Sequence, residues 1–383
     1  MIRIVLAGAG HCHAEVLRRG RLFTARGYTV TVISPDADHV YSGMAPGLLA
    51  GSWAWREASL PVAELARREG IEFIQDRVTG LDPVGKRVYC SSHEPVPYEV
   101  LSINLGSETL PFPGSPERIW PAKPTRGLAE AFRFLRERSD HYAASAPKQP
   151  RPPITVAVIG GGFGGVELAA NAASYLGTSG KVTIYARRLA PSLAGNPRRM
   201  QYLRRVLDDR GIGVHEGEWV DPATIEADLT LIATGIHPPA VLREFNLPLA
   251  PDGALPVDRF LRVSGEDDVF AVGDCASFLP GPLPRVGVFP VRQQPVLIHN
   301  VLVRAESLLR ADRSASGAGP DHGLKPFKAT GPYLQGMNLG PRRGLLYRGS
   351  WTVTGAPAWH LKRLIDALFV RRYRRYRRLP PAA

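Results

Sequence analysis

The chain opens with a short apolar run, IRIVLA at residues 2–7, which ends in a glycine-rich turn. A segment with helical spacing and a basic outer face follows, and a second apolar run, YTVTVIS, occupies residues 28–34. This order predicts a strand, a tight turn, a helix and a second strand. The same order returns at residues 154–186, from ITVAVIGGGFGG to KVTIYA, so we expect two such units.

Each predicted turn carries glycines at the spacing that suits a dinucleotide pyrophosphate. In a G-x-G-x-x-G turn the glycines permit the bend, the close approach of backbone to the phosphates and the packing of helix on strand. Gly160, Gly162 and Gly165 occupy all three positions, whereas the first turn has Gly8 and Gly10 and then His13 in the third position. One such match is weak evidence, but two in the same order predict two nucleotide sites.

Two later strands end in polar or glycine residues. DLTLIATGIHPP, residues 228–239, contains Ala233-Thr234-Gly235, and VFAVGDCA, residues 269–276, contains Gly273-Asp274. A strand that delivers a carboxylate at its carboxyl end places it at the crevice where open α/β sheets bind ligands. Asp274 is therefore expected to accept hydrogen bonds from sugar hydroxyls, with an ordinary Gly-Asp turn as the alternative.

Composition restricts the remaining possibilities. The chain has 383 residues, enough for two or three domains, and is 44% hydrophobic and 22% charged, which is an ordinary globular mixture. It contains no apolar run long enough to span a bilayer and no secretory leader, so a cytoplasmic location is expected. Its three cysteines lack C-x-x-C spacing, and His11, Cys12 and His13 do not complete a metal-ligand set, so no metal is expected.

Positive charge is concentrated at the carboxyl end. The formal net charge of the chain is +13. From Arg342 to the end there are eleven Lys or Arg residues and one acidic residue, Asp366, so this tail has a net charge of +10 (11 − 1). Because the body is nearly neutral, the charge predicts a local anionic partner for the tail and no nucleic-acid partner.

The same tail has helical periodicity. In WHLKRLIDALFVRRYRRYRR the apolar side chains recur at three- and four-residue spacing, at Leu361, Leu364, Ile365, Leu368, Phe369, Tyr373 and Tyr376. The remaining face is expected to carry Lys362, Arg363, Arg371, Arg374, Arg375 and Arg378. The pattern predicts a basic amphipathic helix on an anionic membrane surface; the alternative is that the stripe packs on the protein body.

The ordered turns and strand ends resemble the two-dinucleotide-binding-domain flavoproteins of the pyridine nucleotide-disulfide oxidoreductase superfamily, over roughly residues 1–300. Five stretches are similar to the type II NADH dehydrogenase branch, and most of all to the NADH-dehydrogenase-like module found fused to selenide, water dikinase. They are VYSGMAPGLLAG (40–51), YEVLSINLGSET (98–109), GGGFGGVELA (160–169), VRQQPVLIHN (291–300) and WHLKRLIDALFVRRY (359–373).

The resemblance implies an α/β fold with two Rossmann-like domains, the NAD(P)H-binding domain being inserted in the FAD-binding domain. A small carboxy-terminal module with the amphipathic helix completes the chain. The expected boundaries are 1–109 and 240–310 for the two parts of the FAD-binding domain, 110–239 for the NAD(P)H-binding domain and 325–383 for the carboxy-terminal module.

The resemblance also implies that the first unit binds FAD. The expected contacts are Gly8, Gly10, His11, His13, Ser34, Pro35, Ser42, Val78, Gly106, Gly273, Asp274, Gln293 and Gln294. His11 and His13 are expected beside the phosphates. The family's acid at the second strand end is replaced by Ser34-Pro35-Asp36, so the ribose contact falls to Ser34 or to Asp36. Gln293 and Gln294 resemble the start of a helix that faces the flavin, with polar capping as the alternative.

The second unit is expected to bind NAD(P)H. The expected contacts are Gly160, Gly162, Phe163, Gly165, Glu167, Arg187, Arg188 and Gly235. The segment Tyr185-Ala186-Arg187-Arg188 lacks the acid that binds an adenosine ribose and adds two arginines, which favours the 2′-phosphate of NADPH. Solvated surface arginines are the competing interpretation.

The cysteine pairs of related disulfide and sulfide reductases are missing, so electrons are expected to pass directly from the nicotinamide through FAD to a quinone-type acceptor. The resemblance also implies that Glu167 is the catalytic residue, because the related flavoproteins have a matching glutamate that faces the nicotinamide and the flavin; a helix-dipole role is the alternative. The protein is then expected to be a peripheral enzyme on the inner face of the cell membrane. A soluble NAD(P)H-dependent reductase of a selenium or sulfur species or a carrier protein, a slow flavin redox sensor, and a homodimer stay open.

Overall fold

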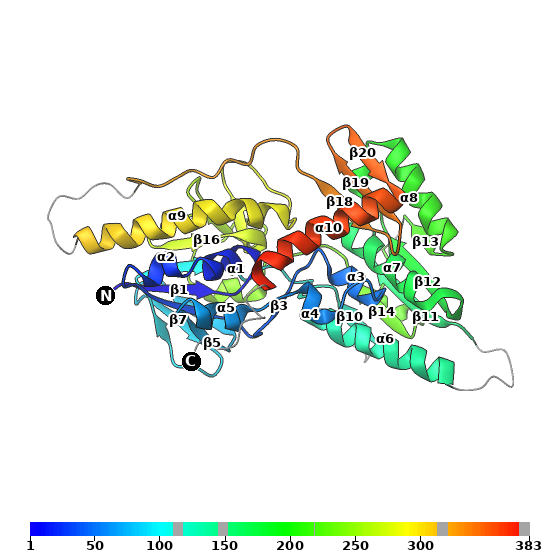
Figure 1. Cartoon of the computed structure of the whole chain (residues 1–383), viewed down its shortest axis with the longest axis horizontal. Coiled ribbons are helices and arrows are strands. Elements are labelled where there is room, and N and C mark those ends of the chain that lie inside the picture. Colours follow the sequence, from blue (N-terminus) through cyan, green and yellow to red (C-terminus); the bar gives the residue numbers. More distant parts are fainter. Residues whose placement is uncertain (110–117, 145–151, 218, 312–320, 375–383) are drawn as a thin grey trace.

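The computed structural model describes residues 1–109, 118–144, 152–217, 219–311 and 321–374. Figure 1 shows two α/β lobes side by side, one formed mainly by the blue and yellow segments and the other by the green segments. The carboxy-terminal helix α10, drawn in red, crosses the surface from the orange strands beside the second lobe to the blue helix α1 of the first. This helix contacts both lobes, since the Gly355 N–H donates to the hydroxyl of Tyr202 in the second lobe and the Tyr373 hydroxyl donates to Glu15 in the first.

The first lobe is built on a parallel sheet in the order β16-β9-β1-β2-β5. Its strands are Val269–Ala271, Val100–Ile103, Arg3–Ala7, Thr29–Ile33 and Glu72–Ile74. Strand β1 pairs in parallel with β2 and with β9, and Ile4 and Leu6 are fully buried. Helices cover both faces of such a sheet, which explains why its central strand is a continuous apolar run.

The second lobe repeats this plan with the order β10-β14-β11-β12-β13. Its strands, all parallel, are Ile119–Pro121, Leu229–Ile232, Ile154–Ile159, Gly180–Ala186 and Gly213–Glu216. Both sheets carry a glycine turn directly after a central strand. The predicted α/β fold with two Rossmann-like domains is confirmed.

The ten α-helices of the described residues connect and cover these sheets. They are α1 (His11–Arg18), α2 (Arg21–Thr24), α3 (Ala45–Leu49), α4 (Trp55–Ala58), α5 (Val62–Arg68), α6 (Arg126–Ala144), α7 (Phe163–Leu176), α8 (Pro197–Asp209), α9 (Val288–Ala311) and α10 (Gly355–Arg374). Small sheets are formed by β3 (His39–Val40) with β4 (Ser59–Leu60), by β6 (Val78–Asp82), β7 (Arg87–Cys90) and β8 (Val96–Pro97), and by β15 (Leu255–Val257) with β17 (Ala276–Phe278).

The carboxy-terminal module consists of an antiparallel sheet and α10. Its strands are β18 (Gln335–Asn338), β19 (Gly344–Arg348) and β20 (Trp351–Thr354). Arg199 of α8 joins this sheet to the second lobe, because its guanidinium stacks on Tyr347 and donates to Thr352 Oγ1 at 2.8 Å. The module is thus anchored on the second lobe and extends towards the first.

Helix α10 divides its apolar residues between two faces. Leu361, Leu364, Ile365 and Leu368 are exposed, whereas Tyr373 is fully buried. The expectation that Lys362 lies on a solvated basic face is wrong, since its side chain is only 12% exposed. Tyr376, Arg375 and Arg378 lie outside the described residues. Among the described helices, none is both long enough and apolar enough to cross a membrane.

Candidate functional site

The first glycine turn packs closely against Asn104. Gly8 follows β1 with a φ of 87°, and a Cβ there would lie 2.5 Å from the Asn104 carbonyl oxygen. A Cβ at Gly10 would lie 2.5 Å from the side-chain amide of the same residue. Only glycine therefore fits both positions. The turn leads directly into α1, whose first turn contains no acid, so its positive N-terminal end remains suited to an anion.

His13 occupies the place of the third glycine and braces this turn. Its Nδ1 lies 2.6 Å from the Gly8 carbonyl oxygen and its Nε2 lies 2.7 Å from Ser102 Oγ on β9. Burial lowers the pKa of His13 to about 4, so the ring is neutral at pH 7. Because both ring nitrogens have protein partners, the geometry indicates that His13 supports the loop.

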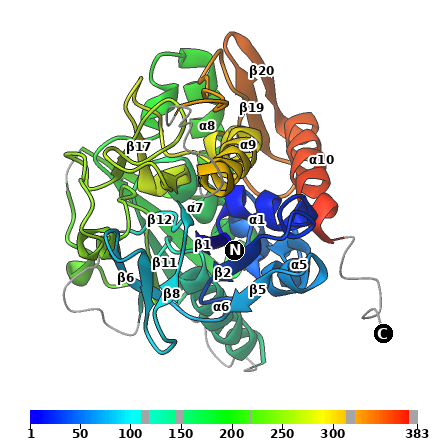
Figure 2. The same cartoon turned by 90° about the vertical axis from the view of Figure 1, so that its left-hand side faces the viewer.

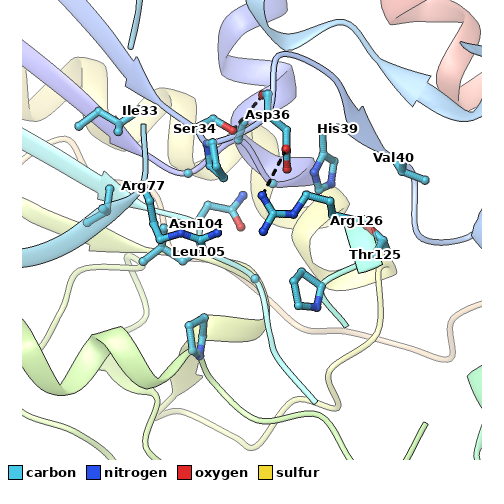
Figure 3. A pocket seen from close by; sticks show the side chains of 18 of the residues that line it. Ile33, Ser34, Asp36, His39, Val40, Arg77, Asn104, Leu105, Thr125 and Arg126 are labelled. Carbon is cyan, nitrogen blue, oxygen red and sulfur yellow. Dashed lines mark hydrogen bonds and ion pairs between the residues drawn. The ribbon is translucent and has the colours of Figure 1, made fainter. Parts of the chain in front are cut away.

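A cavity of about 630 Å³ opens beside the first turn. The sequence-predicted residues that line it are Gly8, Gly10, Ser34, Pro35, Val78 and Gly106. It runs from the carboxyl end of the first sheet to the beginning of α6, as Figure 3 shows. His39 also lines it, and the buried Nε2 of that ring has no hydrogen-bond partner among the described residues.

The cavity is crossed by an ion pair that joins the two lobes. Arg126, in the first turn of α6, lies 3.8 Å from Asp36 on the loop after β2, and Arg77 adds a second guanidinium to the lining (Figure 3). Ser34 Oγ donates to the Asp36 carbonyl oxygen at 3.2 Å. Sequence reasoning missed Arg77 and Arg126, because neither belongs to a local motif and only the packing of the lobes brings Arg126 to Asp36.

Asp274 does not line this cavity itself but is hydrogen-bonded to a residue that does. The hydroxyl of Ser107, a lining residue, donates to Asp274 Oδ2 at 2.8 Å. Gly273, with a φ of 75°, donates its backbone N–H to Gln293 Oε1 at 2.9 Å. The carboxyl ends of β9 and β16 are therefore joined by polar contacts at the edge of the cavity.

The two glutamines lie inside α9 and not at its start. The helix begins at Val288, and Gln293 and Gln294 are 2% and 4% exposed. Gln294 Nε2 donates to the carbonyl oxygen of His11 at 2.8 Å. The polar-capping alternative does not describe them, because they connect α9 to the strand end at Gly273 and to the first turn of α1.

The second glycine turn has the same design. Gly160 has a φ of 125°, and a Cβ there would clash with the carbonyl group of Ala233. A Cβ at Gly165 would clash with the carbonyl oxygen of Gly160, so the third glycine here permits close packing of α7 on β11. Gly162 has open space around it, and Gly235, with a φ of 40°, follows the neighbouring β14.

Glu167 lies in the second turn of α7 and is 8% exposed. Its Oε1 accepts the backbone N–H of Asn338 on β18 at 2.6 Å. Burial raises the pKa of Glu167 to about 7, against the opposing effect of Lys362. This carboxyl group therefore exchanges its proton near physiological pH, which is the property expected of a proton donor or acceptor.

Lys362 of α10 lies buried beside this carboxyl group. Its Nζ donates to Asp366 Oδ2 and to the carbonyl oxygen of Gly43, both at 2.8 Å. Burial acts to lower the pKa of Lys362, but the negative charges of Asp366 and Glu167 outweigh it and the net shift is upward. A permanent positive charge thus lies between α7 and the turn that contains Gly43 and the half-buried Ser42.

The end of β12 presents a basic surface. Ala186 ends the strand, and Arg187 and Arg188 follow it with exposed side chains. The ring of Tyr185 stacks on that of His215, with centroids 5.0 Å apart. The nearby carboxylate of Glu216 is occupied, since it accepts the backbone N–H of Leu189 at 2.9 Å and pairs with Arg204 at 2.7 Å.

The cysteines are free thiols. Cys12 and Cys275 are buried, and burial raises the pKa of Cys275 to about 11 and that of the half-buried Cys90 also to about 11. Thiolates therefore do not form at neutral pH. In the part of the chain that the structure describes, no three His, Cys, Asp or Glu residues gather in a way that could hold a metal ion.

Comparison with known proteins agrees with this geometry. The family described as pyridine nucleotide-disulphide oxidoreductase matches residues 2–301. A type II NADH:quinone oxidoreductase of Staphylococcus haemolyticus is 22% identical over 395 residues, which covers 95% of this chain and 94% of that protein. The resemblance stated from the motifs is confirmed at this level.

Solved structures share the fold. NDH2 from Plasmodium falciparum in complex with NADH superimposes with a TM-score of 0.74 at 14% identity, covering 98% of this chain and 96% of that one. The sulfide:quinone oxidoreductase of Aquifex aeolicus superimposes with a TM-score of 0.68 at 15% identity, covering 98% and 92%. The similarity extends over the carboxy-terminal module as well as the two lobes.

Proposed function

Because the chain belongs to the pyridine nucleotide-disulphide oxidoreductase family, we propose that it is an FAD-dependent NAD(P)H oxidoreductase that passes two electrons to a quinone. The observation that carries the proposal is the presence of two glycine turns at the carboxyl ends of two parallel sheets, in a chain whose cysteines are all free. Bound FAD would accept a hydride from the nicotinamide and pass the electrons on. The quinone is proposed because the curated relatives reduce one.

The cavity beside the first turn has the features that FAD requires. Gly8 and Gly10 let the backbone approach a pyrophosphate, and the N-terminus of α1 with Arg77 and Arg126 supplies positive charge. Ser34 and Asp36 offer polar groups for ribose hydroxyls, and the unpartnered Nε2 of His39 needs a polar ligand atom. Asp274 and Ser107 would hold the part of the cofactor that lies nearest the strand end.

Glu167 is proposed to hold the proton that the acceptor takes up. Reduction of a quinone to a quinol by NAD(P)H takes up one proton in addition to the transferred hydride, and a carboxyl group with a pKa of about 7 can deliver that proton near neutral pH. Asn338 keeps the carboxyl group oriented through its backbone N–H, and Lys362 replaces part of the charge when the proton leaves. The free enzyme would then recover the proton from solvent.

The outer face of α10 is proposed to bind a membrane surface. Four apolar side chains on this face, Leu361, Leu364, Ile365 and Leu368, are between 36% and 54% exposed. Figure 2 shows α10 at the edge of the molecule, with no other labelled element outside it. Exposed apolar side chains on a helix that leads into a strongly basic tail suit an anionic bilayer, where a lipid-soluble quinone resides.

Tryptophans support this orientation. Trp55 of α4 and Trp351 of β20 are 39% and 48% exposed, and α4 and β20 both contact α10. Arg363 of α10 stacks on Trp53 and on Trp359, with its guanidinium 4.0 and 4.8 Å from the ring centroids. Tryptophan and arginine together are typical of the interfacial layer of a bilayer. We therefore propose a peripheral location on the inner face of the cell membrane.

NADPH is proposed as the preferred donor. Ala186 stands where an acid would bind the 2′-hydroxyl group of NADH, and Arg187 and Arg188 extend from the same strand end into solvent. The carboxylate of Glu216 accepts the Leu189 N–H and pairs with Arg204, so its negative charge is compensated. The electrostatic potential at this strand end therefore favours a phosphate dianion.

Anaerobic stopped-flow mixing of the purified yellow protein with NADPH and with NADH tests the proposal. We expect rapid bleaching of flavin absorbance, faster with NADPH, and reoxidation when a short-chain quinone is added. A colourless, folded protein that does not take up FAD would refute the assignment, and a bleached flavin that quinone does not reoxidise would refute the acceptor.

A further inference from the structure

The inner face of helix α10 holds the segment from Tyr41 to Gly47, in which a turn leads into α3. Lys362 donates to the carbonyl oxygen of Gly43 in this turn. Arg363, the next residue, donates to the carbonyl oxygen of Ser52, beyond the end of α3, at 2.5 Å. The Lys362 contact satisfies a turn carbonyl group with a buried charge that is itself paired to Asp366. Such a hydrogen bond is stronger than one between neutral groups, so it fixes the turn firmly to the helix.

An aromatic stack continues this attachment. The ring of Phe369 stacks on that of Tyr41, with centroids 4.6 Å apart and an interplanar angle of 29°. Tyr41 in turn meets the ring of His11, the first residue of α1, at 5.1 Å. The helix thereby reaches the glycine turn through two ring contacts.

The last turns of α10 reach the same place from another side. Arg372 donates to Gln294 Oε1 at 3.3 Å, and Gln294 Nε2 donates to the carbonyl oxygen of His11. Tyr373, fully buried, donates from its hydroxyl to Glu15 Oε2 of α1 at 3.3 Å. Three separate segments near the proposed cofactor are therefore joined by one helix: the segment from Tyr41 to Gly47, the start of α1 and the second turn of α9.

We propose that α10 is a clamp that retains the flavin, with Lys362 and Phe369 as its positioning residues. The inference rests on the proposed function, because it assigns the three segments to FAD binding. It goes further by giving α10 two tasks: its outer apolar face binds the membrane, and its inner face keeps the flavin loops closed. Neither positioning residue lines the cavity beside the first turn, and neither do the residues they contact, Tyr41, Gly43 and His11. Their chain neighbours Gly10 and Val40 do line it, so the effect of the positioning residues on FAD passes through the backbone of these two segments.

The test measures the rate at which FAD leaves the holoenzyme, followed by the rise of free-flavin fluorescence after dilution into detergent-free buffer. Phe369→Ala is expected to release FAD about tenfold faster than the wild type, because an aromatic pair of this kind is lost. Phe369→Tyr keeps the stack and is expected to restore the wild-type rate. Leu364→Ala, on the outer face of the same helix, is the matched control and is expected to leave the rate unchanged.

Lys362 is tested with Asp366 replaced at the same time. The double variant Lys362→Met/Asp366→Asn removes the contact to Gly43 together with the partner charge of Asp366. Glu167 then lacks its nearby cation, and it stays neutral by keeping its proton. The double variant is expected to release FAD faster and to change the visible circular dichroism of the bound flavin, which a loss of stability alone does not alter. Far-UV circular dichroism confirms that each variant is folded.

The outcomes separate the clamp from the proposed function. Wild-type protein that binds no FAD contradicts the proposed function. Wild-type protein that binds FAD and is bleached by NADPH, while Phe369→Ala and the double variant both retain FAD as long as the wild type, contradicts only the clamp. Faster release by Phe369→Ala that Phe369→Tyr does not restore also contradicts it.

Discussion

The carboxylate oxygen Oε1 of Glu167 lies 2.6 Å from the backbone nitrogen of Asn338, which donates its hydrogen to it. This contact joins α7, the helix that follows the second glycine turn, to the first strand of the carboxy-terminal sheet. The amide of Asn171 strengthens the junction, since its Nδ2 donates to the carbonyl oxygens of Glu167 and Asn338 at 2.7 and 2.9 Å. A buried acid with a pKa of about 7 is thus held between two structural units.

Replacing this acid is expected to stabilise the protein at high pH. The pKa of Glu167 in the folded chain, about 7, exceeds the ordinary value of 4.5. Its contribution to stability is therefore complete below pH 4.5 and is lost as the pH rises through 7. Because glutamine does not ionise, the free energy of unfolding of Glu167→Gln at high pH should exceed that of the wild type by at most about 3 kcal/mol. Melting temperatures should be higher than those of the wild type at pH 8 and equal at pH 4, whereas a constant difference would contradict the shifted pKa.

The same substitution is expected to impair transfer to the quinone. With a proton donor missing, steady-state quinone reduction should fall by about 100-fold, and the decline of the wild-type rate above pH 7 should disappear. Flavin bleaching by NADPH should be unchanged, because that step needs no proton from Glu167. Glu64→Gln, at a surface ion pair with Arg67, serves as the control. Equal loss in both half-reactions would point to a structural defect instead.

Substitution of the first glycine turn is expected to abolish FAD binding. Gly8→Ala introduces a Cβ 2.5 Å from the Asn104 carbonyl oxygen at a φ of 87°. Gly27 has a similar φ of 79° but no atom within 4 Å of the added Cβ, so Gly27→Ala carries only the backbone penalty of about 1 kcal/mol. The ratio of flavin to protein absorbance should fall for the first variant and stay at the wild-type value for the second.

Removal of the two arginines after β12 is expected to reduce the preference for NADPH. Arg187→Ala/Arg188→Ala should raise the KM for NADPH about 10- to 100-fold, the effect of losing charge-assisted hydrogen bonds to a phosphate, and change that for NADH little. Ala186→Asp supplies a carboxylate for the ribose hydroxyl groups and should lower the KM for NADH below the wild-type value. Arg205→Ala, an exposed arginine on α8, is the control. Parallel changes for both nucleotides would refute the 2′-phosphate site.

Loss of the outer leucines of α10 is expected to weaken membrane binding. Leu361→Ser/Leu364→Ser/Leu368→Ser removes apolar area that can enter the bilayer, so the fraction that sediments with anionic phosphatidylglycerol vesicles should fall by at least about tenfold. The control is Leu279→Ser. Leu279 is 58% exposed in the loop that follows β17, and its replacement should leave the sedimented fraction unchanged. Binding by the triple variant that equals the wild type, in low and high salt alike, would show that this face is not the docking surface.

Local patterns predicted the two α/β units because their causes are local. An apolar run followed by Gly160, Gly162 and Gly165 predicts a strand, a turn and a helix, since only glycine fits beside the carbonyl groups of the neighbouring strand. The strand ends at Gly235 and Gly273 were likewise readable from short segments. His13 was recognised as a departure at the third glycine, but its pairing with Ser102, 89 residues away, has no signature in the motif.

The linear order of residues determined by itself that this protein has two nucleotide turns, no cysteine pair spaced for redox chemistry and a basic helical tail. Tertiary structure alone decided which face of α10 is buried, because helical periodicity identifies a stripe but not its neighbour. Lys362 became an interior cation only through Asp366 and Gly43, and Glu167 acquired its shifted pKa only through burial against Asn338. Those properties arise from desolvation and long-range contacts, which depend on where distant segments meet.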